Sequence, residues 1–449
     1  MQIDLVAAGA VGDGKSDCTA ILQAALDTCS RNGGGKVIVP AGRYVSGAIR
    51  LGDNVELHVE AGAVLSATLR REDYPPFPDS AAPRDCAFLN ALHAKNVSLT
   101  GDGVITGNAL SFFHDDPDNG GNGEEHLCFD DPHQFRPKLA RFEDVENLHI
   151  SGITLKDSAF WTLHLAGCRR VEIETLRIEN HRRACNSDAI DIDCCRDVLI
   201  RDSFLQTGDD ALCVKSTREI SARYGICENI RMENCSTFSN SAALKIGTET
   251  FGDIRNIEFR NCTVDRSSHA VAIYARDGGK IEDIRFSCIR GSAVKHGNAP
   301  RHKFHWTWWG SGDAIFISAS PRRENEYSGT IRNIRLEDVD LCGENSCFIS
   351  SYPEFFKVSD IFLKNCRIRF EKNGTQSAGV FDEMPSVRNR FPHDAPAFFL
   401  ENVRKLVMKN CSVTYSQKRD SHWRSEFEII NSKDLQIDCQ GMTTPTTDA

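Results

Sequence analysis

Apolar and polar residues alternate in short segments along this chain, and one such frame recurs at matching places. Asp188 is followed by Ala-Ile-Asp-Ile, and Asp210, 22 residues later, is followed by Ala-Leu-Cys-Val. The frame returns at 161–165, 240–246, 268–273 and 312–317. Alternation of this kind is typical of a strand with one buried face, so each copy predicts one β-strand.

A second series of apolar segments starts at regular intervals. The first residues are Asn147, Arg170, Asp197, Asn229, Asn256, Asp283, Asn333, Asp360, Lys405 and Asp434. Most steps between them are 23–32 residues, whereas two steps of 50 and 45 residues indicate insertions at 290–312 and 370–398. Self-similarity of this length is typical of a solenoid. We therefore predict an all-β fold, a parallel β-helix, forming one catalytic domain over residues 1–449, with both insertions near the substrate cleft.

Residues 1–50 predict an N-terminal cap for this solenoid. Gly9 to Ser16 satisfy the phosphate-loop pattern G-x-x-x-x-G-K-S, but Asp13 and Asp17 oppose an anion there. A tight turn before a helix is the better interpretation. The amphipathic stretch 21–29 predicts that helix, and Asn32 to Gly35 predict its C-terminal end. A helix over one open end protects the core and the strand edges.

Matching residues of adjacent coils stack about 4.8 Å apart. One predicted column reads Trp161, Asp188, Asp210, Ala242, His269 and Asp313, with Asp209 beside Asp210. Three neighbouring carboxylates repel one another, and this repulsion raises the pKa of at least one of the three. A structural ladder would avoid this cost, whereas a site that needs one protonated and one ionised carboxyl would require it. Asp188, Asp209 and Asp210 are therefore the candidate catalytic residues.

Composition narrows the function further. The net charge of −10 argues against a nucleic-acid partner. No apolar run approaches the ~20 residues of a membrane span, and the start of the chain lacks a signal peptide. We therefore expect no membrane partner and a cytoplasmic location, or a secreted protein if a leader has been removed. The oligomeric state stays open.

The 18 cysteines do not predict metal or disulfides. Several follow an asparagine at one phase of the repeat, where a free thiol serves as a small buried apolar group. No Cys-x-x-Cys pair has zinc spacing.

Two loops contain residues that are candidates for ligand binding. Loop 108–135 contains His114, Asp115, Asp116 and Asp118, which favour a solvated loop, with calcium binding as the alternative. His302 to Trp309, with three tryptophans, favours a sugar-stacking platform, with core packing as the alternative.

Several motifs together resemble one enzyme family. They are Gly9 to Gly14, Gly33 to Gly42, Arg136-Pro137, Trp161 to His164, Asn186-Ser187-Asp188 and Gly208-Asp209-Asp210. Their order is similar to that in glycoside hydrolase family 28, the polygalacturonase family, and the resemblance covers most of residues 1–320.

The resemblance implies a right-handed parallel β-helix that cleaves pectin-type glycosides with inversion, without metal or other cofactor. Asp209 would be the general acid, and Asp188 and Asp210 the bases that activate water. Inversion requires carboxyls roughly 6.5–9.5 Å apart, a separation that we expect adjacent coils to supply.

The candidate substrate-binding residues are Asn186, Lys245, His269, Tyr274, Arg276 and Trp161. The family's Gly-His-Gly should fall at 241–243, and its Arg-x-Lys at 272–274, but both are absent. His269 is the replacement for the histidine unless it is a satisfied surface residue. Lys245 and Arg276 are the available replacement cations, unless Lys245 pairs with Asp191. Lys215 is expected to neighbour Asp193 on the next coil.

The leading hypothesis is an inverting, exo-acting glycosidase on pectin-like oligosaccharides, because the insertions would wall off one end of an open groove. A β-helix lyase or epimerase acting on uronates is one alternative. A non-catalytic, tailspike-like carbohydrate-binding fibre is the other.

Overall fold

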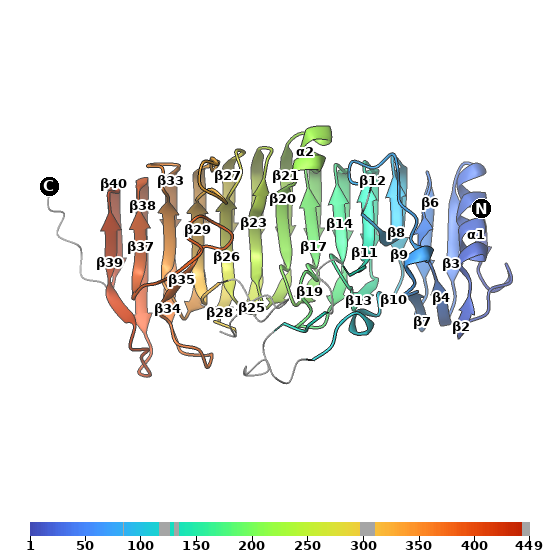
Figure 1. Ribbon diagram of the computed structural model, residues 1–449, viewed down its shortest axis with the longest axis horizontal. Helices are drawn as coiled ribbons and strands as arrows, with labels where there is room; N and C mark the ends of the chain where they lie inside the picture. The colour runs from blue at the N-terminus through green and yellow to red at the C-terminus, as the bar shows by residue number, and fades with distance from the viewer. Residues whose placement is uncertain (84, 116–125, 130–133, 297–309, 442–449) are drawn as a thin grey trace.

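A computed structural model describes residues 1–83, 85–115, 126–129, 134–296 and 310–441. The chain is a parallel β-helix whose coils stack along one long axis from α1 to β40 (Figure 1). The α-helices of the described residues are α1 (Thr19–Arg31) and α2 (Arg218–Tyr224), and the 3-10 helices are η1 (Arg71–Asp73) and η2 (Ala109–Ser111). The prediction of an all-β solenoid is confirmed.

The larger sheet consists of two rows of parallel strands. The first row contains β1 (Gln2–Asp4), β3 (Gly35–Val39), β6 (Val55–Val59), β9 (Lys95–Thr100), β12 (Glu146–Ser151), β15 (Arg169–Glu174), β18 (Arg196–Arg201), β21 (Cys227–Glu233), β24 (Ile254–Arg260), β27 (Lys280–Ser287), β30 (Thr330–Glu337), β33 (Val358–Lys364), β38 (Val403–Tyr415) and β40 (Lys433–Gln440). The second contains β2 (Asp13–Asp17), β4 (Gly42–Ser46), β7 (Ala63–Ala67), β10 (Val104–Thr106), β13 (Thr154–Lys156), β16 (Arg177–Glu179), β19 (Phe204–Thr207), β22 (Ser236–Ser239), β25 (Thr263–Ser267), β28 (Arg290–Ala293), β31 (Asp340–Gly343), β34 (Arg367–Phe370) and the end of β38.

A second sheet carries the frame around the aspartates. Its strands are β5 (Ile49–Arg50), β8 (Ala87–Leu92), β11 (Lys138–Glu143), β14 (Leu163–Ala166), β17 (Ile190–Asp193), β20 (Leu212–Ser216), β23 (Ala242–Thr250), β26 (His269–Ala275), β29 (Asp313–Ala319), β32 (Cys347–Ser351), β37 (Ala395–Glu401) and β39 (Trp423–Ile430). A separate antiparallel hairpin is formed by β35 (Val380–Asp382) and β36 (Arg390–Pro392). Apolar residues of every coil point inward into one continuous core.

The register of the paired strands in the structure matches the repeat predicted from the sequence. Leu148 pairs with Val171, Val171 with Val198 and Val198 with Ile230, and the same phase continues to Leu435. The residue that begins each predicted strand has a positive φ, for example 60° at Asn147 and 59° at Asn229. Asparagine and aspartate tolerate this conformation better than other non-glycine residues, which explains their recurrence.

The N-terminal residues form a strand and a capping helix. Asp13 Oδ1 accepts hydrogen bonds from the amides of Lys15 and Ser16, both at 2.8 Å, so these amides serve the turn rather than a phosphate. Helix α1 buries Leu22, Leu26 and Cys29 among other residues, and it lies at the end of the stack in Figure 1. The amide of Gly34 closes the helix on the carbonyl of Cys29.

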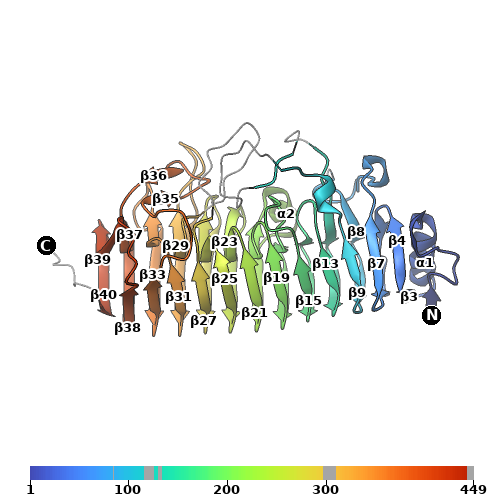
Figure 2. The same ribbon diagram turned by 90° about the horizontal axis from the view of Figure 1, so that it is seen from below.

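The hairpin β35–β36 belongs to the predicted insertion 370–398. Figure 2 shows it outside the stacked coils, over the second sheet. Its Phe381 packs on Phe348 and Phe399, which belong to an aromatic cluster on the outward face of this sheet. Of the other insertion, residues 297–309 lie outside the described residues, and so does the proposed sugar platform from His302 to Trp309.

Three further observations concern sequence-based expectations. All 18 cysteines fall within the described residues and are free. No helix in the described ranges is long and apolar enough to span a membrane. In loop 108–135, Arg183 forms an ion pair with Asp115, while Asp116 and Asp118 lie outside the described residues.

Candidate active site

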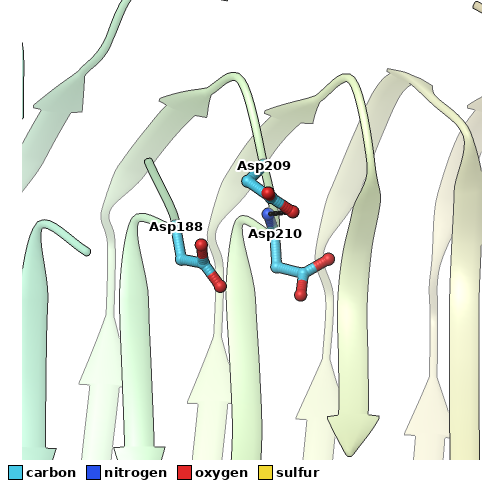
Figure 3. A group of neighbouring side chains, drawn as sticks. All are labelled: Asp188, Asp209 and Asp210. Atoms are coloured by element: carbon cyan, nitrogen blue, oxygen red, sulfur yellow. Dashed lines mark hydrogen bonds between the residues drawn. The ribbon is translucent and has the colours of Figure 1, made fainter. Parts of the chain in front are cut away.

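Asp188, Asp209 and Asp210 come together just before β17 and β20, at the same end of two neighbouring strands (Figure 3). Because Ile190 pairs with Leu212, Asp188 and Asp210 occupy equivalent positions in adjacent coils. The register extends this column to Ala242, His269 and Asp313, as predicted.

The three carboxyls form one cluster, in which one oxygen from each lies within 4.8 Å of the others. The roughly 6.5–9.5 Å typical of inverting enzymes is a separation between whole carboxyl groups, so the expected separation stays a prediction. The cluster forms because Asp188 and Asp210 follow the strand spacing of adjacent coils, and Asp209 is the neighbour of Asp210 in the chain.

Burial and mutual repulsion make this cluster retain protons. Burial, followed by repulsion from Asp210, raises the pKa of Asp209 to about 6. Burial, followed by repulsion from Asp191 and Asp209, raises the pKa of Asp188 well above its usual value. Asp209 is half-buried, whereas Asp188 and Asp210 are buried. The most accessible of the three is therefore one that holds a proton up to mildly acidic pH.

Asp210 is anchored through both carboxylate oxygens. Its Oδ1 accepts hydrogen bonds from Ser241 Oγ at 3.0 Å and from the amide of Ala242 at 3.2 Å. Its Oδ2 accepts one from Lys245 Nζ at 2.5 Å. Burial opposes the charged form of Lys245, but the attraction of Asp210 keeps the pKa of this lysine above its usual value. Asp210 is thus held in place opposite a buried cation.

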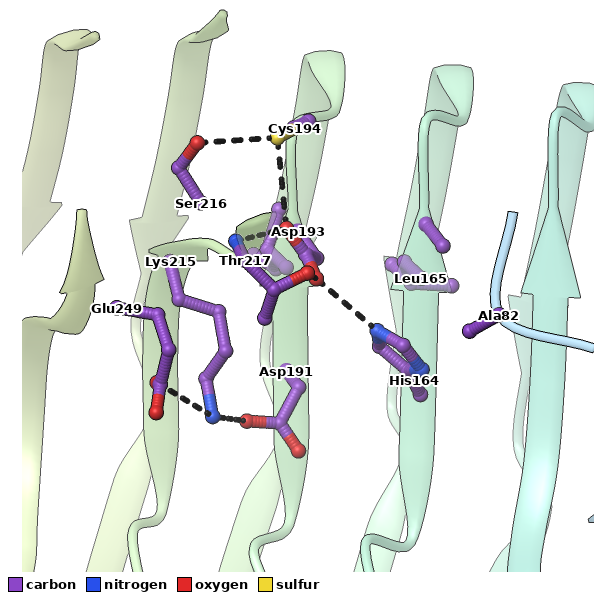
Figure 4. A network of polar contacts seen from close by, with 12 residues as sticks. Ala82, His164, Leu165, Asp191, Asp193, Cys194, Lys215, Ser216, Thr217 and Glu249 are labelled. Atoms are coloured by element: carbon purple, nitrogen blue, oxygen red, sulfur yellow. Dashed lines mark hydrogen bonds and ion pairs between the residues drawn. The ribbon is translucent and has the colours of Figure 1, made fainter. Parts of the chain in front are cut away.

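A second buried lysine lies near Asp188. Lys215 Nζ lies 2.7 Å from Asp191 Oδ1 and 3.7 Å from Asp188 Oδ2. Figure 4 shows this amine between the carboxylates of Asp191 and Glu249. Asp188 and Asp210 therefore each face a lysine from the following coil.

These lysines differ from expectation in their partners. Lys215 pairs in register with Asp193, as predicted, but its amine reaches Asp191 and Asp188. Lys245 does not pair with Asp191, because Cys213 occupies the intervening coil and Asp210 is within reach.

Three carboxylates at this spacing form a set that is able to hold a metal ion. Lys245 and Lys215 already place two positive charges against the same carboxylates. A divalent ion would have to compete with both of them, so the donor set fits a proton-transfer site better than a cation site.

Asn186 lies beside Asp209. Its backbone amide donates a hydrogen bond of 2.9 Å to Asp209 Oδ2, and its side-chain Oδ1 accepts one of 3.0 Å from Arg136 Nη2. Arg136 also binds the carbonyls of Ala159 and Cys185. Its guanidinium lies 4.7–5.5 Å from the ring centroids of Phe113, Phe129 and Phe160. Sequence motifs indicated Arg136, but not this role.

Trp161 is half-buried next to Asp188 in the column. The amine of Lys138 lies 4.3 Å from its ring centroid, and that of Lys215 lies 3.9 Å away. The ring therefore borders the charged groups around Asp188.

His269, Tyr274 and Arg276 are buried and engaged with other protein groups. His269 bonds Tyr274 through Nε2 at 2.8 Å, and its Nδ1 lies 3.1 Å from Asp313. Arg276 donates hydrogen bonds to Ser318 and to the carbonyl of Glu383 near the hairpin. All three side chains are thus engaged within the protein, where the 370–398 insertion covers this part of the sheet. Their selection as substrate ligands stays a prediction.

Comparisons with known proteins point to one family. The family model for glycosyl hydrolases family 28 matches residues 29–299. A probable polygalacturonase of Vitis vinifera is 30% identical over 267 residues, which are 56% of this chain and 52% of that protein. An exo-poly-alpha-D-galacturonosidase of Dickeya chrysanthemi is 24% identical over 47% of this chain and 41% of its own length. The matched part thus spans about half the length of these relatives.

Solved structures share the fold over nearly the whole chain. A hyperthermoactive exopolygalacturonase from Thermotoga maritima has a TM-score of 0.67 and 22% identity, with 91% of this chain and 92% of that chain covered. A family 28 exopolygalacturonase from Yersinia enterocolitica has a TM-score of 0.72 and 17% identity, with 98% and 79% covered.

Proposed function

Because the chain belongs to glycosyl hydrolases family 28, we propose that it hydrolyses O-glycosidic bonds of pectin-type oligosaccharides, releasing sugars from one end with inversion. The observation that carries the proposal is the half-buried Asp209, with a pKa raised to about 6, beside the anchored carboxylate of Asp210. This arrangement supplies an acid and a base within one site.

Asp209 is the general acid. It protonates the oxygen of the leaving group as the glycosidic bond breaks. A pKa near 6 leaves the carboxyl protonated in mildly acidic solution and still acidic enough to give up its proton. The hydrogen bond from the amide of Asn186 fixes one of its oxygens.

Asp210, assisted by Asp188, is the base that activates water. A water that donates to two acceptors at ~2.8 Å each holds those acceptors roughly 4.6 Å apart. The carboxylate oxygens, within 4.8 Å of one another, fit a single water shared in this way. Since burial and its neighbours favour the protonated form of Asp188, Asp210 takes the larger part of this role.

Inversion is supported by the anchoring of Asp210. A retaining enzyme needs a carboxylate oxygen that is able to attack the anomeric carbon. Both oxygens of Asp210 already accept hydrogen bonds from Ser241, Ala242 and Lys245. Attack by water is the reaction that such a fixed acceptor supports.

Exo action is supported by the hairpin β35–β36. This hairpin covers the outward face of the second sheet from β26 onward, two coils beyond Asp210. A long polymer would have to pass this cover, whereas a chain end would not. Two of the similar structures are named exopolygalacturonases.

The test is product analysis on oligogalacturonides, rhamnogalacturonan fragments and neutral α-glycosides. We expect single terminal sugars of inverted anomeric configuration, read by proton NMR. Asp209→Asn should lower kcat by about 10²–10⁴-fold. Asp265→Asn, at an exposed position of β25, is the matched control and should leave kcat unchanged.

Other outcomes separate the alternatives. An unsaturated product that disappears with a chelator would indicate a lyase, and conversion without cleavage would indicate an epimerase. Binding without any turnover would indicate a carbohydrate-binding protein. Full activity of Asp209→Asn would overturn the assignment of the acid.

A further inference from the structure

An irregularity in β23 aims one acidic side chain outward beside the aspartates. Val214 of β20 pairs with Ile246, but Ser216 pairs with Thr250, so Lys215 faces three residues of β23 instead of one. Bulges of this kind re-aim side chains and occur next to active sites. The side chain of Glu249, in this bulge, is 32% exposed, whereas that of Lys215 is 4% exposed.

The amine of Lys215 lies between Glu249 and the candidate catalytic residue Asp188. Lys215 Nζ lies 3.9 Å from Glu249 Oε2 and 3.7 Å from Asp188 Oδ2. On its other side, Glu249 Oε1 lies 3.8 Å from Arg322. Burial disfavours its charged form, but Lys215 and Arg322 keep the pKa of Glu249 below its usual value. Glu249 therefore presents an ionised carboxylate to solvent across the Lys215 amine from Asp188.

The cations around this carboxylate are already engaged. Lys215 pairs with Asp191, and Lys245 pairs with Asp210. Arg322 binds Asp277 through two hydrogen bonds of 3.0 and 3.1 Å. Ala272 and Tyr274, at the strand positions expected to hold cations, are buried within the aromatic cluster. A sugar that lies beside Asp188 and Glu249 thus meets carboxylates, with the described cations paired to other groups.

We propose that Glu249 determines specificity by accepting hydrogen bonds from the hydroxyls of a neutral sugar next to the scissile bond, while it repels a uronate at that position. This inference rests on the proposed function and narrows its substrate to pectin-type oligosaccharides in which that sugar is neutral. Carboxylates are acceptor-only groups that suit hydroxyl donors, and a like charge opposite one is a strong basis for rejection.

The test compares neutral glycosides with a uronide. The Asp209→Asn protein is titrated calorimetrically with methyl α-D-galactopyranoside and with the corresponding galacturonide, and also with methyl α-L-rhamnopyranoside. At about pH 5 the carboxyl that this substitution replaces is protonated in the unaltered protein as well, so the charge is matched. We expect a neutral glycoside to bind about tenfold more tightly than the uronide.

Glu249→Gln keeps the shape of the side chain and removes its charge. In the Asp209→Asn background it should bring the two affinities to within about threefold, chiefly by tighter uronide binding. Glu324→Gln, at an exposed position near Arg322, is the matched control and should leave the ratio unchanged.

Three results would overturn the proposal: uronide binding as tight as that of the neutral glycosides, a ratio that Glu249→Gln does not change, or no binding of any of these ligands. Because binding is measured without turnover, it is separate from the proposed hydrolysis. If the unaltered protein cleaves nothing, the proposed function fails while the preference for neutral ligands is still read from the titrations.

Discussion

The ammonium group of Lys245 lies 2.5 Å from Oδ2 of Asp210 on the preceding coil, and both side chains are buried. Lys245→Met removes the cation and leaves Asp210 with an uncompensated charge. We expect a loss of about 3–5 kcal/mol in the free energy of unfolding, measured by denaturant titration. We also expect kcat to fall at least tenfold, because the base loses its anchor.

A matched control for this prediction is Lys280→Met, at an exposed position of β27. It should leave both quantities unchanged. If Lys245→Met kept its stability and its kcat, the ion pair would have no part in holding Asp210.

The pH dependence of activity should report the general acid. Burial and Asp210 raise the pKa of Asp209 to about 6, and only its protonated form is able to donate a proton. We therefore expect kcat/KM to fall as the pH rises through about 6, by about tenfold per pH unit on the alkaline side. An alkaline limb that lies at the same pH in Asp209→Glu and Asp209→Asn would assign it to another group.

The same raised pKa predicts a stability effect. A carboxyl whose folded-state pKa is above its unfolded value of 3.8 contributes stability that is fully present below that value and lost as the pH rises through about 6. A shift of this size corresponds to about 3 kcal/mol. Asp209→Asn should therefore be more resistant to urea than the unaltered protein at pH 8, and this advantage should vanish near pH 4. Equal resistance at both pH values would contradict it.

The fold and the catalytic column follow from local patterns. The phase that relates Leu148 to Leu435 and the stacking of Asp188 on Asp210 depend only on strand alternation and repeat length, both of which are visible in the sequence. The same register places Lys215 beside Asp193. Pattern alone was therefore sufficient for the strand register between adjacent coils.

Other contacts depend on how insertions and bulges fold back onto the sheet. The sequence offers Arg276 as a replacement cation two residues beyond the expected motif, but the insertion 370–398 folds back over it. Glu249 owes its exposure to a bulge that no alternation pattern shows. Lys245 reaches Asp210 rather than Asp191, which lies two coils away beyond Cys213, and this side-chain contact is not part of the strand register. Contacts of these kinds are tertiary and were not available from the sequence.

Arg276 should prove structural. Its guanidinium donates to Ser318 and to the carbonyl of Glu383, and burial lowers its pKa to about 10. Arg276→Met should lower the free energy of unfolding by about 3 kcal/mol or more, because buried acceptors lose their donor. Below its unfolding transition, the variant should keep its KM. Arg323→Met, at an exposed position, is the control, and a selective rise in KM for Arg276→Met would restore its role in substrate binding.

Arg136 is expected to position the general acid through Asn186. It holds the side chain of Asn186, whose amide donates the hydrogen bond to Asp209 Oδ2. That bond favours the ionised form of Asp209. Arg136→Lys loses the planar fork and should displace this amide, so the pKa of Asp209 should rise. We expect kcat to fall about tenfold and the alkaline limb of the pH profile to move to higher pH.

The shift of the limb distinguishes positioning from a general loss of structure, which would lower activity at every pH alike. Asn186→Ala, which removes the side chain held by Arg136, should move the limb in the same direction. Arg169→Lys, at an exposed site of β15, is the matched control and should move neither kcat nor the limb. A profile that keeps its limb in Arg136→Lys would show that the aromatic groups around Arg136, rather than Asp209, depend on this residue.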